Sequence, residues 1–516
     1  MKSKINTTDQ QTLSPLLGDG SDSKNEKWIK IFQYANCIDP EEILENYEAN
    51  DLGFGKLFSD TYSRVLKFVS DAGIWRHYDG ARWVDDTSET FVEHCARLLV
   101  NYLKSKDNEG IEFFTGQLSR LSIRKTMIKD ARSISPVKMA DFDSDPLLLN
   151  ALNCTIDLRD PSRREHNPDD LLTKTANVKY DPSAKCDRWD KFIEEIMCGD
   201  ENLAAFLQRA LGYALSGDVS KECLFILWGR TTRNGKGTLM ETLLKIMGDY
   251  AKSLSPAVLS QKSKSSDLPS PELAGVAGVR LVTVSEPDKG MKLNAALVKR
   301  LTGGDPILAR YLRRNPIEYR PQFKMFINTN HLMEIDDDTV FSSGRIMMIP
   351  FEKHFEEKDR DHTLKDTLKS PKNASGIFNW LLQGYRNFKA KDLKAPEKSV
   401  KALNTYRQEC DTIALFMESM LVKCGEGEWI KTSNLYNDYR KWYTSCDIEG
   451  KSQKEFVDTL RQKGLLSRHN TDGHIVRGYK MKPNEDAKAD DGGSLEDTQT
   501  RSNQCSTTVI RRKSQK

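Results

Sequence analysis

The stretch FILWGRTTRNGKGTLMETL, residues 225–243, constrains the fold more than any other part of the chain. An apolar run ends at a glycine, a polar loop follows, and a lysine between two glycines opens a segment with helical spacing. A strand, a glycine-rich loop and a helix in this order turn backbone N–H groups and a helix N-terminus toward one point, where phosphate groups bind. The sequence therefore predicts an α/β core that contains a phosphate-binding loop.

The loop offers each group that a nucleotide triphosphate needs, although it departs twice from the usual pattern. Lys236 supplies the cation, and Thr238 offers a hydroxyl to Mg²⁺ from the first helical turn. The loop is one residue longer than usual, and Gly237 stands where Ser or Thr is expected. We expect the segment 230–233 to accommodate the extra residue. A glycine-rich turn without a ligand is the alternative. The predicted ATP-binding residues are Gly229, Asn234, Gly235, Lys236, Gly237 and Thr238.

Three further apolar runs typical of strands lie next to side chains that ATP hydrolysis requires. VRLVTVSEPD places Glu286 directly after a strand, where it can bind Mg²⁺ or polarise water, and Asp288 ranks second. FKMFINTN ends at Asn330, whose amide can orient water near the γ-phosphate, with Asn328 as the competing choice. Arg345 precedes IMMIP, and in a ring-shaped ATPase such an arginine can reach the γ-phosphate of a neighbouring subunit. The predicted catalytic residues are therefore Lys236, Glu286, Asn330 and Arg345.

Between the strands VRLVTV and FKMFI, the runs ILARY and IEYR predict a β-hairpin with a basic tip. Arginine binds phosphates whatever the base sequence, so the hairpin can contact DNA. A solvated turn is the alternative. The arginines of this segment are Arg310, Arg313 and Arg314.

Composition limits the remaining possibilities. A chain of 516 residues with a net charge of +3 can hold several domains, but it has no strong overall attraction for nucleic acids. The cysteines form no Cys-x-x-Cys pair, which excludes the spacing of a zinc ribbon. No apolar stretch approaches the roughly 20 residues of a membrane span. The sequence thus predicts a soluble cytoplasmic protein without a membrane segment.

The order of these motifs resembles that of the phage and plasmid primase-type helicases of helicase superfamily 3, which are relatives of the poxvirus primase-helicases. The resemblance covers about 45–483 and rests on LLNALNCTIDLRD, the NGKG loop, TGGDPILAR, FINTN and GRIMMIPF. It implies an AAA+-like core that assembles as a hexameric ring, with ATP and Mg²⁺ between subunits and DNA in the central channel. Relatives often have two arginines before the last strand, whereas this chain has Gly344-Arg345.

The resemblance also implies a role for individual residues. Lys236 and Thr238 match the Walker A positions, and Glu286 matches the Walker B acid. Asn330 matches the sensor asparagine and Arg345 the arginine finger, while Arg310, Arg313 and Arg314 fall in the DNA-binding hairpin.

The C-terminal part looks like the winged-helix domain that these helicases carry. Its helix SQKEFVDTLRQKG and the hairpin after it could lie against a duplex. The predicted DNA-binding residues here are Lys454, Arg461, Lys463 and Arg477. Tyr436, Tyr439 and Trp442, at helical spacing, are predicted to belong to the core.

We predict disordered tails at both ends, over 1–25 and 484–516. Between them we expect a helical N-terminal domain (26–140), a connecting or collar region (141–217), the ATPase core (218–355), a helical lid or linker (356–402) and a winged helix (403–483).

The sequence favours an ATP-dependent replicative DNA helicase of a mobile element, acting on single-stranded and forked DNA, with a separate primase as a partner. The pair of aspartates in FDSDP lacks the zinc motif and further acidic strand of a primase. The alternatives are an ATP-switched DNA-binding initiator without unwinding activity and a nucleotide kinase.

Overall fold

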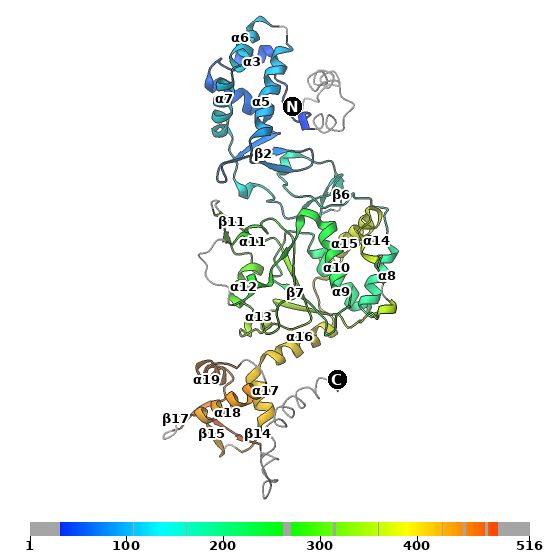
Figure 1. Ribbon diagram of the computed structural model, residues 1–516, viewed down its shortest axis with the longest axis vertical. Coiled ribbons are helices and arrows are strands. Elements are labelled where there is room, and N and C mark those ends of the chain that lie inside the picture. Colours follow the sequence, from blue (N-terminus) through cyan, green and yellow to red (C-terminus); the bar gives the residue numbers. More distant parts are fainter. Residues whose placement is uncertain are drawn as a thin grey trace.

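The computed structural model describes residues 31–106, 108–160, 162–261, 270–312, 316–359, 361–425, 427–446, 450–469 and 473–482. Both predicted tails lie outside these ranges. Figure 1 shows a helical unit near the N-terminus, an α/β core in the middle and a smaller C-terminal unit at the other end. Among the described residues, no helix combines the length and the apolar character that crossing a membrane requires.

The N-terminal unit packs helices against a small antiparallel sheet with strand order β1-β2-β3. Strands β2 and β3 form a hairpin that turns at Asp79-Gly80: the Asp79 carboxylate accepts the N–H groups of Ala81 and Arg82, and Gly80 has φ = 99°. The elements are α3 (Pro40–Asn46), α4 (Asp51–Tyr62), β1 (Leu66–Val69), β2 (Ile74–Tyr78), β3 (Trp83–Asp86), α5 (Thr90–Lys104), α6 (Glu109–Leu118) and α7 (Leu121–Ile134).

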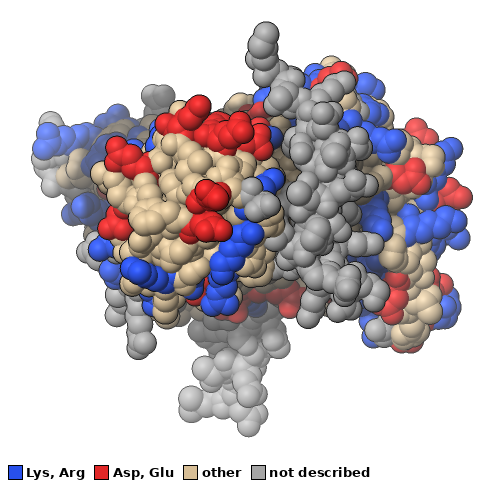
Figure 2. All heavy atoms as spheres, turned by 90° about the horizontal axis from the view of Figure 1, so that it is seen from above, with Lys and Arg blue, Asp and Glu red and all other residues tan. Residues whose placement is uncertain are grey.

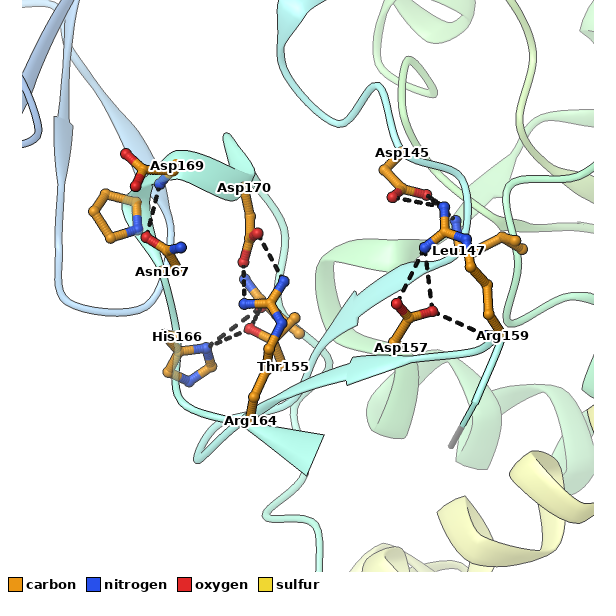
Figure 3. A network of polar contacts seen from close by, with 12 residues as sticks. Asp145, Leu147, Thr155, Asp157, Arg159, Arg164, His166, Asn167, Asp169 and Asp170 are labelled. Atoms are coloured by element: carbon orange, nitrogen blue, oxygen red, sulfur yellow. Dashed lines mark hydrogen bonds and ion pairs between the residues drawn. The ribbon is translucent and has the colours of Figure 1, made fainter. Parts of the chain in front are cut away.

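The turn-rich segment that follows forms a second small antiparallel sheet, held by ion pairs (Figure 3). Arg159 lies between two carboxylates, with Nη2 2.7 Å from Asp145 and Nη1 3.1 Å from Asp157. Arg64, just after α4, pairs with Asp169 at 2.8 Å and so links the N-terminal unit to this segment. The elements are η2 (Met139–Asp141), β4 (Leu148–Asn150), β5 (Thr155–Asp157), β6 (Ser162–Arg164) and η3 (Pro168–Asp170).

The core contains a parallel sheet with strand order β13-β7-β12-β9-β8. Four strands are those that the sequence predicts: β7 (Leu224–Trp228), β9 (Leu281–Ser285), β12 (Lys324–Thr329) and β13 (Ile346–Pro350). The edge strand β8 (Ala251–Leu254) is not predicted by the sequence. The molecule therefore has an α/β fold built on a parallel sheet.

Side chains alternate along these strands and divide the core into two hydrophobic clusters, one on each face of the sheet. Phe225 and Leu227 pack with α8 (Asp187–Ile196), α9 (Glu201–Tyr213), α10 (Lys236–Met247) and α15 (Pro371–Lys391). Leu224 and Ile226 pack with α12 (Ala295–Thr302) and α16 (Glu397–Cys410) on the other face. The first cluster continues across the predicted domain boundaries near 218 and 355, so residues on both sides of each boundary share one hydrophobic core.

The remaining helices of the core are η4 (Gly248–Tyr250), η5 (Pro256–Leu259), α11 (Pro271–Ala274), α13 (Thr339–Ser342), η6 (Glu357–Asp359) and α14 (Leu364–Lys369).

The hairpin predicted between the second and third strands is present as an antiparallel pair. Strand β10 (Ile307–Ala309) pairs with β11 (Ile317–Tyr319). Two residues of the predicted basic tip, Arg313 and Arg314, lie outside the described residues.

The C-terminal unit contains the predicted helix and the hairpin after it, as α19 followed by the antiparallel strands β16 and β17. Strands β14 and β18 pair with each other, and a second small sheet has the order β15-β17-β16. Tyr439 and Trp442 are buried in this unit and Tyr436 packs against them, as predicted. The elements are α17 (Thr412–Met420), β14 (Leu421–Lys423), β15 (Trp429–Lys431), α18 (Thr432–Ser445), α19 (Gln453–Gln462), β16 (Leu466–His469), β17 (Gly473–Arg477) and β18 (Tyr479–Met481).

Candidate nucleotide site

Helix α10 begins at Lys236, immediately after the loop that follows β7. Gly235 has φ = 85°, and a Cβ atom there would lie 2.4 Å from Ile196 Cγ2, so both the backbone and the space require glycine. Gly237 differs, because a Cβ atom there would meet nothing within 4 Å. The first turn of α10 therefore opens onto free space beside its N–H groups.

Lys236 is almost completely buried, with 3% of its surface exposed. Its Nζ donates a hydrogen bond to Asn330 Oδ1 at 2.7 Å. Burial lowers the pKa of Lys236 to about 8, and the nearby negative charge of Glu286 opposes this shift only in part. The site thus holds a cation that is poorly solvated and has a neutral amide as its hydrogen-bond partner, an environment that favours an added anion.

Glu286 and Asn330 follow the neighbouring strands β9 and β12, so they lie at the same edge of the sheet as Lys236. The N–H of Glu286 donates to the Asn328 carbonyl at 2.8 Å. Glu286 has φ = 53°, a left-handed conformation that is strained for a residue with a side chain. The side chain that contacts Lys236 is that of Asn330, while Asn328 lies buried within β12.

Close packing around Gly229 accounts for the start of the loop. A Cβ atom at Gly229 would lie 2.3 Å from Asn234 Nδ2 and 3.1 Å from Lys236 Nζ. Asn234 is buried, and its Nδ2 donates to the Thr231 carbonyl at 2.6 Å. Asn234 therefore braces the loop internally, and a side chain at Gly229 would displace both Asn234 and Lys236.

A set of contacts on the loop has no counterpart in the sequence analysis. Residues 351–357, which follow β13 and are here called the strap, contact the loop. His354, Phe355 and Glu357 contact Thr232 and Arg233. The sequence carries no signal for them, because the two segments are more than 100 residues apart and share no motif.

Arg345 lies at the opposite end of the sheet from Lys236. It precedes β13, and its carbonyl accepts the N–H of Leu224, the first residue of β7. Its guanidinium donates to Glu222 at 2.6 Å and to the Thr302 hydroxyl at 2.8 Å. The structure therefore does not bring Arg345 together with Lys236 of the same chain.

The predicted DNA-binding residues differ in their surroundings. Arg310, Lys454 and Arg477 are exposed. Arg461 forms an ion pair with Asp458, and Lys463 with Asp411, so both cations have a carboxylate partner within the chain.

One segment at the N-terminal end of the molecule, residues 39–53, is acidic, in contrast to the basic residues predicted to bind DNA. In the view from this end, Asp and Glu side chains lie above and within an area of uncharged residues, and Lys and Arg side chains lie along its lower side (Figure 2). The segment 39–53 contains no Lys or Arg, and its carboxylates are all exposed: Asp39, Glu41, Glu42, Glu45, Glu48 and Asp51. All the charged side chains of this segment are negative, so the segment itself would repel phosphate groups.

Two family models match the chain. "D5 N terminal like" matches residues 55–198, and a family of unknown function (DUF5906) matches residues 227–345. The second match contains the loop, Glu286 and Asn330, and ends at Arg345.

Several viral proteins are similar over most of the chain. "Putative helicase L207/L206" of Acanthamoeba polyphaga mimivirus is 29% identical over 78% of this chain and 46% of its own length. "Putative helicase 121R" of Invertebrate iridescent virus 3 is 27% identical over 68% of this chain and 40% of its own length. "Putative primase C962R" of African swine fever virus is 21% identical over 67% of this chain and 38% of its own length. The chain thus spans less than half the length of these relatives.

The solved apo structure of the NrS-1 C-terminal region aligns with 83% of this chain and 100% of its own, with a TM-score of 0.49 and 12% identity.

The sequence relationships, with the matched N-terminal model and the viral relatives, show that the chain is related to the phage and viral primase-helicases.

Proposed function

We propose that the chain is an ATP-dependent replicative DNA helicase of a virus, phage, plasmid or other mobile element. The proposal rests on one observation: Lys236, Asn330 and Glu286 lie close together at the carboxyl ends of the parallel strands. Lys236 and Asn330 are in direct contact, and Glu286 influences the pKa of Lys236. A lysine at a helix N-terminus, beside a polar amide and a carboxylate on adjacent strand ends, is suited to binding and hydrolysing a nucleotide triphosphate.

ATP with Mg²⁺ would supply the phosphoryl group that water attacks, and the residues present fit this ligand. Lys236 would move its hydrogen bond from Asn330 to phosphate oxygens, and the N–H groups at the start of α10 would bind the same phosphates. Thr238 and Glu286 would hold Mg²⁺. Among the described residues no group of three His, Cys, Asp or Glu side chains forms a metal cage, which suits an ion held largely by phosphate and water oxygens. Asn330, released from Lys236, would orient the attacking water.

The position of Arg345 supports a ring. An arginine at the far end of the strands cannot reach the nucleotide of its own chain, but it could reach a neighbour's in a head-to-tail hexamer of AAA+-like cores. We further propose that the hairpin β10–β11 contacts DNA in the channel through Arg310, Arg313 and Arg314. The C-terminal unit would act as a winged helix, and a separate protein would supply priming.

The experiment that tests the proposal measures steady-state ATP hydrolysis with and without single-stranded DNA, followed by unwinding of a forked duplex. Wild type should hydrolyse ATP faster with DNA and separate the fork. Lys236→Ala should lose both nucleotide binding and hydrolysis, whereas Glu286→Gln should retain binding and lose hydrolysis.

The alternatives give different results in the same assays. Hydrolysis without any unwinding, over a range of salt and Mg²⁺ concentrations, would rule out the helicase. DNA binding that changes with ATP in the wild type, without unwinding, and that no longer responds to ATP in Lys236→Ala would favour the ATP-switched initiator. Hydrolysis stimulated by a nucleoside monophosphate and indifferent to DNA would favour a kinase.

A further inference from the structure

The phosphate-binding loop is longer than usual, and its outer part needs support that its own residues do not supply. Arg230, Thr231, Thr232 and Arg233 are all exposed, and Arg233 has φ = 56°. Within the loop, the Asn234 side chain braces only the Thr231 carbonyl. A loop of this kind would lose conformational entropy when it closed on phosphate groups, at a cost in affinity.

The strap provides this support through four contacts from one side. The N–H of Phe351 donates to the Trp228 carbonyl at 2.6 Å, which aligns the strap with the end of β7. His354 Nδ1 lies 2.9 Å from the Thr232 carbonyl, and the N–H of Phe355 donates to the Arg233 carbonyl at 2.9 Å. Glu357 pairs with the Arg233 guanidinium at 2.7 Å. Because a carbonyl can only accept, His354 carries a proton on Nδ1 in this contact.

The direction of these bonds has a consequence for the N–H groups of the loop. In a planar trans peptide, the carbonyl and the N–H point in opposite directions, and the described part of the chain has no cis peptide. The strap holds the carbonyls of Thr232 and Arg233 outward. The N–H groups of Arg233 and Asn234, which belong to the same two peptide units, therefore point away from the carbonyl groups that the strap binds.

We propose that His354 and Glu357 are positioning residues of the nucleotide site, because they orient the two loop peptides whose N–H groups bind phosphate. The proposal rests on the nucleotide binding proposed above and explains how a loop with an extra residue keeps a phosphate-binding shape. In this proposal the two peptides hold the phosphate groups in the ground state and in the transition state alike. Loss of the strap contacts should therefore weaken the binding of ATP and ADP alike and leave the maximal turnover rate nearly unchanged.

The test compares KM for ATP, Kd for ADP and kcat in the full-length chain. His354→Ala should raise KM and Kd by about 2- to 12-fold, the range expected for one lost hydrogen bond. His354→Asn keeps an N–H donor near the position of Nδ1 and should restore most of the affinity. Lys358→Ala is the matched control, since Lys358 is exposed, pairs with Glu356 and is next to the strap in sequence.

The ion pair allows an independent test that does not depend on the histidine. Arg233→Glu and Glu357→Arg should each weaken ADP binding by about 1.5- to 5-fold, because both partners are more than half exposed and such pairs contribute little. The double variant should recover affinity. Thermal unfolding of each variant shows whether the fold is intact.

The outcomes separate this inference from the proposed function. If wild type binds ADP, and His354→Ala and the two charge variants bind it equally well, the strap does not position the loop. A fall in kcat with unchanged KM and Kd would also contradict it. If wild type binds neither ADP nor ATP, the proposed function fails and the inference fails with it.

Discussion

At the scale of single residues, Lys236 is the side chain on which the candidate site depends. Its charge is buried next to a neutral amide, so its proton is held less firmly than that of a solvated lysine. Burial is the main cause of the lowered pKa of about 8, against an ordinary value of 10.5. The charge that would bind phosphate therefore depends on pH in a range where a solvated lysine keeps its proton.

We expect the affinity for ADP to fall as the pH rises through about 8. The protonated lysine attracts phosphate, and above pH 8 the free protein must first take up a proton before it can bind, which costs up to about tenfold in Kd per pH unit. Titration calorimetry between about pH 6.5 and 9.5 measures this dependence. Lys236→Gln should bind weakly, with an affinity that does not change over the same range. An affinity of wild type that is constant up to the highest pH would contradict the lowered pKa.

At the scale of helices and strands, the sequence predicts the centre of the fold better than its edges. Strands β7, β9, β12 and β13 are buried on both faces and therefore appear as continuous apolar runs that are easily identified. Strand β8 is missed because two of its four residues, Lys252 and Ser253, are polar and exposed at the sheet edge.

The same contrast applies to the candidate site. Lys236, Glu286 and Asn330 could be predicted because parallel strands end at one edge of a sheet, so residues just after them must lie close together. The contact between Lys236 and Asn330 bears out this expectation of proximity, while the chemical roles stay predictions. The strap could not be predicted, because its contacts are mainly to backbone carbonyls, which leave no trace in residue type. The ion pair of Arg345 with Glu222 likewise depends on tertiary packing alone.

One buried arginine joins several elements, and its removal should destabilise the core. Arg280 is 1% exposed and precedes β9; it donates to the carbonyls of Leu215 and Leu148 and lies over the ring of Tyr250. We expect Arg280→Ala to lower the free energy of unfolding by roughly 2–4 kcal/mol, because two buried carbonyls lose a charged donor and a cavity remains. Urea unfolding followed by tryptophan fluorescence measures the change.

Arg300→Ala provides the matched control for this prediction. Arg300 is exposed on α12, so its replacement should change the free energy of unfolding by no more than about 0.5 kcal/mol. Equal unfolding midpoints for the two variants would show that Arg280 does not join these elements.

At the scale of the whole molecule, the proposed hydrolytic site would be divided between the two ends of the sheet. Lys236, Glu286 and Asn330 lie at the carboxyl ends of the strands, and Arg345 lies at the amino ends of β7 and β13. The five residues of β7 separate these ends by roughly 13 Å along the strand.

A mixing experiment tests whether the two halves act between subunits. Lys236→Ala keeps Arg345, and Arg345→Ala keeps Lys236, so each variant alone should show little DNA-stimulated ATP hydrolysis. In a ring assembled at random from equal amounts of both, about one quarter of the interfaces join an intact Lys236 to an intact Arg345. The mixture should therefore recover up to about a quarter of wild-type hydrolysis.

Glu222→Ala, which frees the guanidinium of Arg345 without removing it, should remain active. If the mixture only equals the average of the two variants, Arg345 acts within its own subunit, where its bonds to Glu222 and Thr302 tie β13 to α12 and to the start of β7.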